Sequence, residues 1–249
     1  MQLLSAAALM TMAACASLPS DPDARAERVE VNDPLEPFNR TMFGFNNALD
    51  AAVLKPVAQA YDAILPTPAK GAVRNALNNM GEPITFMNAV LQGEFVRARE
   101  TLTRFVFNST FGLGGLVDFM GDLGMKRHDE DFGQTLAVWG VPDGPYLVLP
   151  FLGPSQVRDL TGFAVDSFAD PVNRTFRGHD IDWAPYARTG TDIVSRRAQL
   201  LGKLEELERN SIDFYATIRS GYRQRRQAEI TNGAAQAPAD LYSESLPTN

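Results

Sequence analysis

Apolar residues near the start of the chain recur with helical spacing. Between residues 38 and 52 they fall at i, i+4, i+7, i+11 and i+14, which places them on one face of a helix. These residues are Phe38, Met42, Phe45, Leu49 and Ala52. A proline lacks a backbone donor and clashes with the turn before it, so Lys55-Pro56 is expected to end or kink this helix. A second short helix is predicted over 57–65.

Prolines and glycines divide the next residues into three further helices. Pro66-Thr67-Pro68 interrupts the chain, with Pro68 suited to a first helical position. The third helix is then predicted over 69–80. Gly81-Glu82-Pro83 is expected to start a fourth helix that reaches about Gln92, and the fifth is predicted over 94–108.

The chain has no convincing run of strictly alternating apolar and polar residues, so the pattern favours an all-α fold. An apolar stretch, 146–152, lies between the turn-forming segments 140–145 and 153–155. Pro150 excludes a central strand there, which leaves an apolar loop or a short hairpin. If this stretch is exposed, it marks a contact with a membrane or a partner.

Helical spacing returns in the back half, with more charge. Ile193, Val194, Leu200, Leu201, Leu204 and Leu207 mark one helix. Phe214, Ile218 and Tyr222 mark another, with Asn210-Ser211 as its cap. Its basic residues are Arg219, Arg223, Arg225 and Arg226. We interpret them as a solvated helix end, where the helix dipole favours basic side chains; a docking surface for an acidic partner is the alternative.

The N-terminus has the form of a bacterial export signal. Residues 2–12 are apolar and small, about as long as a signal-peptide core and too short to span a bilayer, and they lead into Ala13-Ala14-Cys15. Small residues before a cysteine resemble a lipobox, in which Cys15 is lipidated; an inert thiol is the alternative. We therefore expect a signal peptide at 1–14, a lipid-anchored polar tether at 15–32, a helical domain at 33–229 and a disordered tail at 230–249.

Composition narrows the chemistry. The 249 residues carry a formal net charge of −7, which argues against a nucleic-acid partner. One cysteine and two histidines leave no cysteine-based metal cage, and no catalytic motif is present, so we expect no cofactor and no enzyme. The His128-Asp129-Glu130-Asp131 cluster is interpreted as a solvated loop, because four adjacent residues cannot all face one metal ion.

A glycine-rich apolar stretch, 111–116, lacks the lysine of a phosphate loop. Two interpretations remain open for Gly112, Gly114 and Gly115. They allow a turn with close backbone approach, or they form a hinge or the wall of a passage.

Several motifs, each weak alone, follow one another in order. They are 33–46 (DPLEPFNRTMFGFN), Lys55-Pro56-Val57-Ala58 with Tyr61, Glu82-Pro83, Asn88 with Leu91-Gln92-Gly93, Thr103-Arg104-Phe105, Asn108, Gly112-Leu113-Gly114-Gly115 with Asp118, Phe132-Gly133-Gln134-Thr135-Leu136, Trp139-Gly140-Val141, Gly144-Pro145-Tyr146, Leu149-Pro150, Gly153-Pro154 and Arg158-Asp159. Together they resemble the MlaA family, also called VacJ, of outer-membrane phospholipid-transport lipoproteins. The resemblance covers roughly 33–222 and is poor over 173–187.

The resemblance implies an all-α fold: a ring of amphipathic helices that lies in the inner leaflet of the bacterial outer membrane around a central polar channel, with the C-terminal helices facing the periplasm. It implies a lipid-anchored protein that removes misplaced phospholipid from the outer leaflet. The phospholipid passes to a soluble periplasmic carrier, and a trimeric porin is the neighbour. The pathway keeps the outer membrane asymmetric.

Polar residues of the front half are the candidates for the inner face of the channel: Asn39, Arg40, Asn46, Asn78, Asn79, Asn88, Arg104 and Asn108. Helix caps and hydrogen bonds between helices are the alternative for these residues. The hinge or gate candidates are Gly112, Gly114, Gly115, Tyr146, Leu147, Leu149 and Pro150. Two rival functions remain: a structural lipoprotein that associates with a porin without transporting lipid, and a lipid hydrolase.

Overall fold

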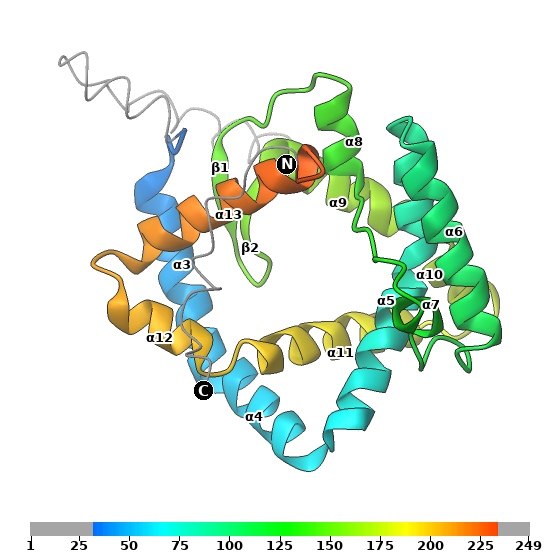
Figure 1. Ribbon diagram of the computed structural model, residues 1–249. Helices are drawn as coiled ribbons and strands as arrows, with labels where there is room; N and C mark the ends of the chain where they lie inside the picture. The colour runs from blue at the N-terminus through cyan, green and yellow to red at the C-terminus, as the bar shows by residue number, and fades with distance from the viewer. Residues whose placement is uncertain (1–31, 234–249) are drawn as a thin grey trace, which may run out of the picture.

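The first helical segment changes its hydrogen-bonding pattern before its proline and does not stop there. The computed structural model describes residues 32–233, and its chain begins with α3 (Glu36–Leu49), the π-helix η2 (Asp50–Leu54) and α4 (Lys55–Ile64). Pro56 stands in the first turn of α4. The interruption predicted at Lys55-Pro56 is thus a change of direction through a π-helical segment, visible between α3 and α4 in Figure 1.

The break predicted at Gly81-Glu82-Pro83 is wrong. Residues Thr67–Leu91 form a single helix, α5, with Pro83 inside it. A proline in a helix interior costs about 3 kcal/mol in isolation, but packing can outweigh that cost. Here α5 lies along α6 (Phe95–Thr110) and buries Asn79, Glu82, Thr85 and Asn88 on either side of the proline.

The rest of the described chain is also mainly helical, which confirms the all-α fold. The remaining helices are α7 (Phe119–Asp122), α8 (Phe132–Val138), α9 (Val157–Ala169), α10 (Pro171–Gly178), α11 (Ala184–Gln199), α12 (Lys203–Asn210) and α13 (Phe214–Ile230). The cap predicted for α13 at Asn210-Ser211 lies elsewhere: the side chain of Asp213 accepts a hydrogen bond from the Ala216 N–H at 3.1 Å.

The apolar stretch at 146–152 enters a short antiparallel hairpin, the only sheet among the described residues. Strand β1 (Tyr146–Leu149) pairs with β2 (Gly153–Gln156), and Pro150 lies in the turn, where its missing donor costs no ladder bond. Tyr146 and Val148 point into a small apolar core with Tyr215 of α13, against which Met42 and Phe43 of α3 pack.

Figure 1 shows the helices arranged as a ring. From α3 the chain runs through α4 and α5 to α6, while α11 crosses between α4 and α5, and α13 returns beside α3. The β1–β2 hairpin lies on the inner side of the ring with its turn toward the central opening. The described helices include none that combines the length and the low polarity needed to cross a bilayer. Cys15, the signal peptide, the tether up to residue 31 and the tail from residue 234 lie outside the described residues.

Candidate functional site

Most buried side chains of this protein are polar and many exposed ones are apolar, which is the reverse of the usual distribution in a soluble protein. Among the described residues, seven apolar side chains are buried, against seventeen polar or charged ones. Many large apolar side chains are exposed instead, among them Phe95 at 70%, Phe111 at 66% and Leu113 at 71%. Contiguous exposed apolar surface is rare on soluble monomers and marks a membrane or a partner.

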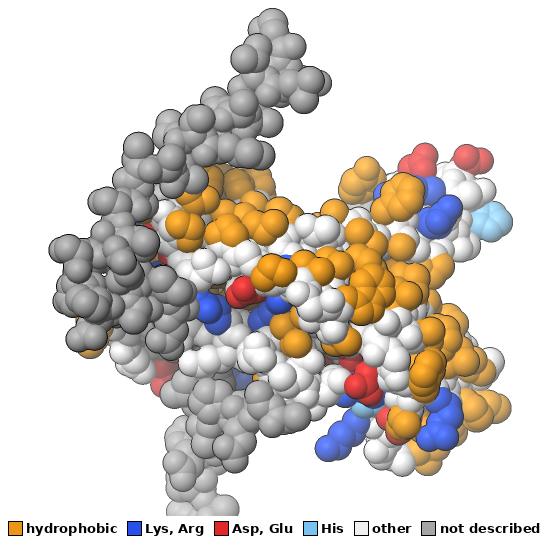
Figure 2. Space-filling model, turned by 90° about the horizontal axis from the view of Figure 1, so that it is seen from above, with side chains coloured by type: hydrophobic (Ala, Val, Ile, Leu, Met, Phe, Trp, Pro, Cys, Tyr) orange, Lys and Arg blue, Asp and Glu red, His pale blue; other side chains and the backbone are white. Residues whose placement is uncertain are grey.

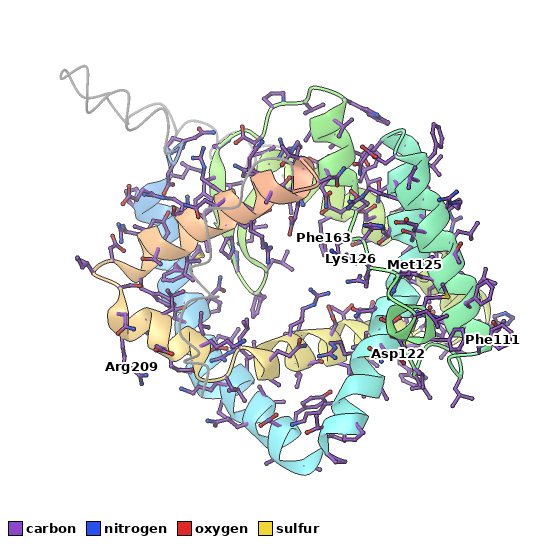
Figure 3. The ribbon with its side chains drawn as sticks, viewed as in Figure 1. Phe111, Asp122, Met125, Lys126, Phe163 and Arg209 are labelled. Carbon is purple, nitrogen blue, oxygen red and sulfur yellow. The ribbon has the colours of Figure 1, made fainter. Side chains whose placement is uncertain are left out.

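Helix α6 shows the inversion most clearly. The large apolar side chains of Phe95 and Leu102 are exposed, while the buried positions are Ala98, Thr101, Arg104 and Asn108. Figure 2 shows hydrophobic side chains gathered in broad patches on the surface seen from above, and Figure 3 shows Phe111 on the outside of the ring. The apolar face of α6 is therefore an outer surface of the molecule.

Arg104 and Asn108 bind one carboxylate. Arg104 Nη2 lies 2.8 Å from both oxygens of Asp118, and Asn108 Nδ2 donates to Asp118 Oδ1 at 2.9 Å. Burial opposes the charge of Asp118, but these hydrogen bonds outweigh it and hold the pKa of that carboxyl below its ordinary value. Asn108 Oδ1 also accepts from the N–H of Met120 at 2.9 Å. Both residues thus fix the 111–122 segment to α6.

Glu82 occupies a buried position between two arginines. Its Oε1 atom lies 3.6 Å from Arg104 Nε and 3.5 Å from Arg127 Nε, and the side chain is 1% exposed. Burial is the main cause that raises the pKa of Glu82 to about 7, against the attraction of Arg127 and Arg104.

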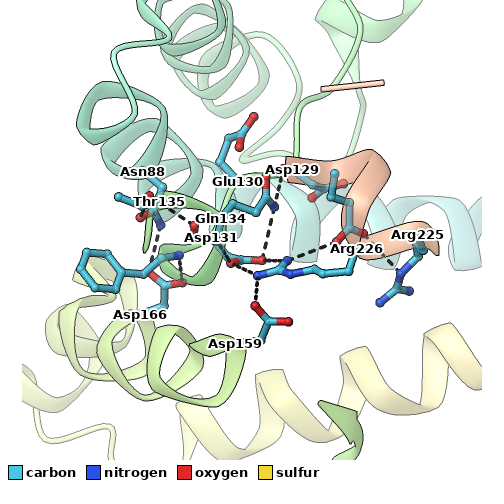
Figure 4. A network of polar contacts seen from close by, with 12 residues as sticks. Asn88, Asp129, Glu130, Asp131, Gln134, Thr135, Asp159, Asp166, Arg225 and Arg226 are labelled. Atoms are coloured by element: carbon cyan, nitrogen blue, oxygen red, sulfur yellow. Dashed lines mark hydrogen bonds and ion pairs between the residues drawn. The ribbon is translucent and has the colours of Figure 1, made fainter. Parts of the chain in front are cut away.

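A second polar network joins α13 to α8 and α9 (Figure 4). Arg226 donates to Asp131 at 2.6 and 2.7 Å and to Asp159 at 3.0 Å, and the Tyr222 hydroxyl donates to Asp159 at 2.5 Å. Burial works against the charge of Asp131, but Arg226 holds the pKa of this carboxyl below its ordinary value.

This network corrects two sequence interpretations. Arg226 is buried and Arg219 donates to the buried carboxylate of Asp33 at 2.7 Å, so the basic residues of α13 are not simply a solvated helix end. Glu130 is also buried, paired with Arg97 at 2.5 Å, so the predicted solvated loop is wrong for Glu130, while the half-buried Asp131 pairs with Arg226. No group of residues suited to a metal ion occurs within 32–233.

Asn88 connects α5 to α8 and α9. Its Nδ2 atom donates to Asp166 at 2.9 Å, and its Oδ1 atom accepts from the Thr135 hydroxyl at 2.9 Å. The Phe132 N–H donates to the other oxygen of Asp166 at 2.8 Å. Burial is the main cause that raises the pKa of Asp166.

Asn39 and Asn46 hold the hairpin against α3. Asn39 is fully buried; it donates to the Tyr146 carbonyl at 3.0 Å and accepts from the Val148 N–H at 2.9 Å. Asn46 does the same at the turn: it donates to the Leu149 carbonyl and accepts from the Phe151 N–H, both at 2.9 Å.

The other polar candidates lie in different places. Arg40 forms ion pairs with Glu36 and with Asp213 on the surface, at 2.8 and 2.6 Å. Asn79 is buried and donates to the Ser109 hydroxyl at 2.9 Å, and Asn78 lines an inner cavity described below.

The glycines at 112–115 form a tight turn between α6 and α7. Gly114 and Gly115 have φ of +71° and +91°, which glycine adopts without strain. A Cβ on Gly115 would lie 2.6 Å from Asn79 Cβ, so the turn needs a glycine to approach α5. This close approach was one of the two interpretations of the sequence; the hinge stays a prediction.

The predicted gate residues differ in exposure. Tyr146 is fully buried, Leu147 and Leu149 are half-buried, and Pro150 is exposed. The most exposed apolar side chains of the hairpin are Phe151 at 73% and Leu152 at 54%, which the sequence analysis did not single out. Their place beyond a proline, in the turn, is the signal that would have found them.

An inner cavity of about 310 Å³ lies between α5, α9, α10 and α11. Asn78 and Thr85 of α5, Phe163 and Asp166 of α9 and Arg196 of α11 are among the residues that line it. Figure 3 shows Phe163 and Lys126 beside the central opening of the ring. This cavity gives the inner side of the ring a recess lined by both polar and apolar side chains.

Fold and surface together define a class: an all-α ring whose elements meet through polar contacts and whose outer surface is largely apolar. The sequence profile of the MlaA lipoprotein family matches residues 31–229. The chain therefore belongs to the MlaA lipoprotein family, as the motifs of the sequence indicated.

Relatives are similar over most of their length. A Haemophilus influenzae protein named intermembrane phospholipid transport system lipoprotein MlaA is 38% identical over 82% of this chain and 81% of its own. The Escherichia coli protein of the same name is 36% identical over 95% and 92%. A solved structure from work on the maintenance of bacterial outer membrane lipid asymmetry is 37% identical in sequence to this chain. The match covers 80% of this chain and 98% of that chain, with a TM-score of 0.71.

Proposed function

We propose that this protein is the outer-membrane component of a phospholipid-transport system. It is anchored by a lipid on Cys15, and its ring lies in the inner leaflet of the bacterial outer membrane. It removes mislocalised phospholipid from the outer leaflet through a polar passage and delivers it to a soluble periplasmic carrier. A trimeric porin is the neighbouring membrane partner.

One observation carries the proposal: the apolar side chains face outward and the polar ones face the contacts between helices. Hydrocarbon around the ring would stabilise Phe95, Phe111 and Leu113, which water would not. Because no described helix crosses a bilayer, helices that lie within one leaflet suit both facts.

A polar interior lowers the barrier that a phospholipid meets. The headgroup resists hydrocarbon because unsolvated charge is costly, whereas the acyl chains resist water by about 0.8 kcal/mol per methylene. A ring with an apolar outside and a polar inside lets the headgroup move while the chains stay in lipid. The inner cavity supports such a path.

The β1–β2 hairpin is placed to shape this passage. Its turn points toward the central opening, and Asn46 holds the turn through the Leu149 carbonyl and the Phe151 N–H. We place the gate at the exposed side chains Phe151 and Leu152, with Leu147 and Leu149 in support. The glycines 112, 114 and 115 are the proposed hinge or wall.

The polar candidates are proposed to act in two ways. Asn78, which lines the inner cavity, faces the passage. Asn39, Asn46, Asn79, Asn88, Arg104 and Asn108 hold the wall together through their hydrogen bonds, and Arg40 fixes α3 to Asp213.

The experiment compares a clean deletion with the complemented strain and measures phospholipid in the outer leaflet with a surface-restricted lipase or label. The proposal expects outer-leaflet phospholipid to rise in the deletion and to fall when the gene is restored. No difference would refute it.

The two rival functions give other results. A structural lipoprotein predicts that Asn78→Asp leaves outer-leaflet phospholipid unchanged while the porin still co-purifies. A hydrolase predicts that purified protein releases fatty acid from phospholipid vesicles. Transport predicts that Asn78→Asp changes outer-leaflet phospholipid, and that purified protein releases no fatty acid from the vesicles.

A further inference from the structure

Charged side chains of both signs line the inner cavity. Three arginines and three aspartates line it. Three ion pairs hold its arginines: Arg188–Asp170 at 2.5 Å, Arg196–Asp192 at 2.8 Å and Arg127–Asp129 at 2.5 Å. Because the cavity is balanced in charge, it suits a ligand that carries a negative and a positive group better than a simple anion.

Arg196 retains donors that a ligand can use, whereas Arg127 is committed to protein partners. The Arg127 Nε atom is buried 3.5 Å from the carboxylate of Glu82, and its Nη1 and Nη2 atoms lie 2.8 and 2.5 Å from the carboxylate of Asp129. Arg196 is 67% exposed and pairs only with Asp192, one helical turn away. A planar guanidinium with free N–H groups binds phosphate oxygens well.

Arg188 is committed elsewhere. It donates to Asp170, to Asn173 and to the Met80 carbonyl, so it joins α11 to α10 and α5. Its role is to hold the cavity's shape, and we do not count it as a ligand contact.

The remaining wall supplies an acceptor and an apolar surface. Both oxygens of Asp192 accept from Arg196 Nε, at 2.9 and 2.8 Å, and the side chain is 36% exposed, so its outer edge can also meet an ammonium group. Phe163 is 54% exposed on α9 and lines the same cavity, and Leu77 and Ile84 of α5 add apolar surface. A phosphate donor, a carboxylate and an apolar wall thus surround one space of about 310 Å³.

We infer that this cavity is a binding site for the zwitterionic headgroup of a phospholipid. Arg196 contacts the phosphate, Asp192 contacts the ammonium, and Phe163 packs on the glycerol and the first methylenes. The inference rests on the proposed function and names the point where the ring holds its substrate.

A photocrosslinking experiment tests the site in the intact protein in nanodiscs that contain ³²P-labelled phosphatidylethanolamine. A photoreactive phenylalanine replaces Phe163 in one variant and Phe95, on the outer surface, in the other. We expect both to capture labelled lipid. Soluble glycerophosphoethanolamine, which has no acyl chains, should suppress capture at position 163 but not at position 95.

The competitor arms identify the ligand. Glycerophosphoethanolamine should compete better than inorganic phosphate, and ethanolamine alone should compete weakly. If inorganic phosphate competes equally well, the cavity is a phosphate site and the headgroup assignment is wrong. If no competitor affects position 163, the cavity is only a solvated recess.

Matched variants test the named contacts. Arg196→Gln should weaken competition by glycerophosphoethanolamine about tenfold, because a charge-assisted bond to phosphate is lost. Arg225→Gln, at a 72% exposed arginine outside the cavity, should have no effect. Asp192→Asn should remove the advantage of glycerophosphoethanolamine over glycerol phosphate. Circular dichroism of each variant confirms the fold, which exposed residues should not alter.

The failure of this inference is distinct from failure of the proposed function. If Arg196→Gln binds the headgroup normally while a deletion strain still accumulates outer-leaflet phospholipid, only the site is wrong. If the headgroup binds and the deletion has no effect on outer-leaflet phospholipid, the transport proposal is wrong.

Discussion

The buried carboxyl of Glu82 makes stability depend on pH in an unusual direction. Its pKa is raised from 4.5 to about 7 in the folded protein, so the folded state holds this proton more tightly than the unfolded chain. The stabilising contribution is therefore full below pH 4.5 and is lost as pH rises through 7, by up to about 3 kcal/mol.

Glu82→Gln should remove this part of the pH dependence, because glutamine resembles the protonated carboxyl. The groups that face Glu82 are Arg104, Arg127 and, through its charge, Asp129. We expect the variant to lose less stability than the wild type between pH 5 and 8, measured by thermal unfolding in detergent micelles. Glu208→Gln, at an exposed carboxylate, is the control; parallel pH curves for all three proteins would contradict the prediction.

Arg226 joins α13 to α8 and α9, so its loss should be costly. Its side chain is 8% exposed and pairs with the 40% exposed Asp131 and with the equally buried Asp159, which keeps Arg158 at 3.2 Å as a second cation. Because Arg226→Gln removes a buried cation and its charge-assisted hydrogen bonds, we expect unfolding to become easier by about 1–3 kcal/mol. The neighbouring Arg225 is 72% exposed, and Arg225→Gln should change stability by less than about 0.5 kcal/mol. Denaturant unfolding of both variants in detergent measures the difference; equal effects would show that the network contributes little.

Single residues also show where sequence reasoning stops. The polar identity of Asn88, Arg104 and Asn108 was visible, but not their partners, because Asp166 and Asp118 are 78 and 10 residues away along the chain. Spacing within one helix says nothing about a side chain on another helix. The alternative of hydrogen bonds between helices describes these three residues well.

At the scale of elements, Asn39 is the buried one of the two asparagines that hold the hairpin against α3. Asn39 donates to the Tyr146 carbonyl of β1, accepts from the Val148 N–H of the same strand, and donates to Asp33 at 2.7 Å. Asn39→Ala leaves the Tyr146 carbonyl and the Val148 N–H buried without these partners, so we expect a loss of about 2–4 kcal/mol. Hydrogen exchange should speed up in β1, while Thr41→Ala, at an exposed position of the same helix, leaves it unchanged. Unaltered exchange in Asn39→Ala would contradict this role.

Element prediction worked best where periodicity and a stop signal agreed. The helix expected over 94–108 is found at Phe95–Thr110, because Gly93, with φ of +79°, separates it from α5. Pro83 predicted a break that does not occur, since local propensity does not include the packing of α5 on α6. The range of α6 was predicted closely, but only the structure shows that Phe95 and Leu102 point outward.

At the scale of the whole molecule, the outward apolar surface should bind a membrane even without the lipid anchor. Phe95 and Phe111 are exposed at 70% and 66%, and burial in hydrocarbon would stabilise both. The Cys15→Ser protein, which cannot be lipidated at that position, should therefore still bind phospholipid vesicles in a sedimentation assay.

Placing one charge on that surface should weaken the binding. In the Cys15→Ser background, Phe95→Asp introduces a carboxylate where hydrocarbon is expected, at a cost of about 1–3 kcal/mol, which lowers vesicle partitioning roughly 5- to 150-fold. Asn210→Asp adds the same charge to an exposed position of α12, a helix rich in charged residues, and should bind like its parent. If both variants bind equally well, the surface around Phe95 does not face lipid. The apolar outside of the ring would then have to be covered by protein, and the porin would be the partner to test there.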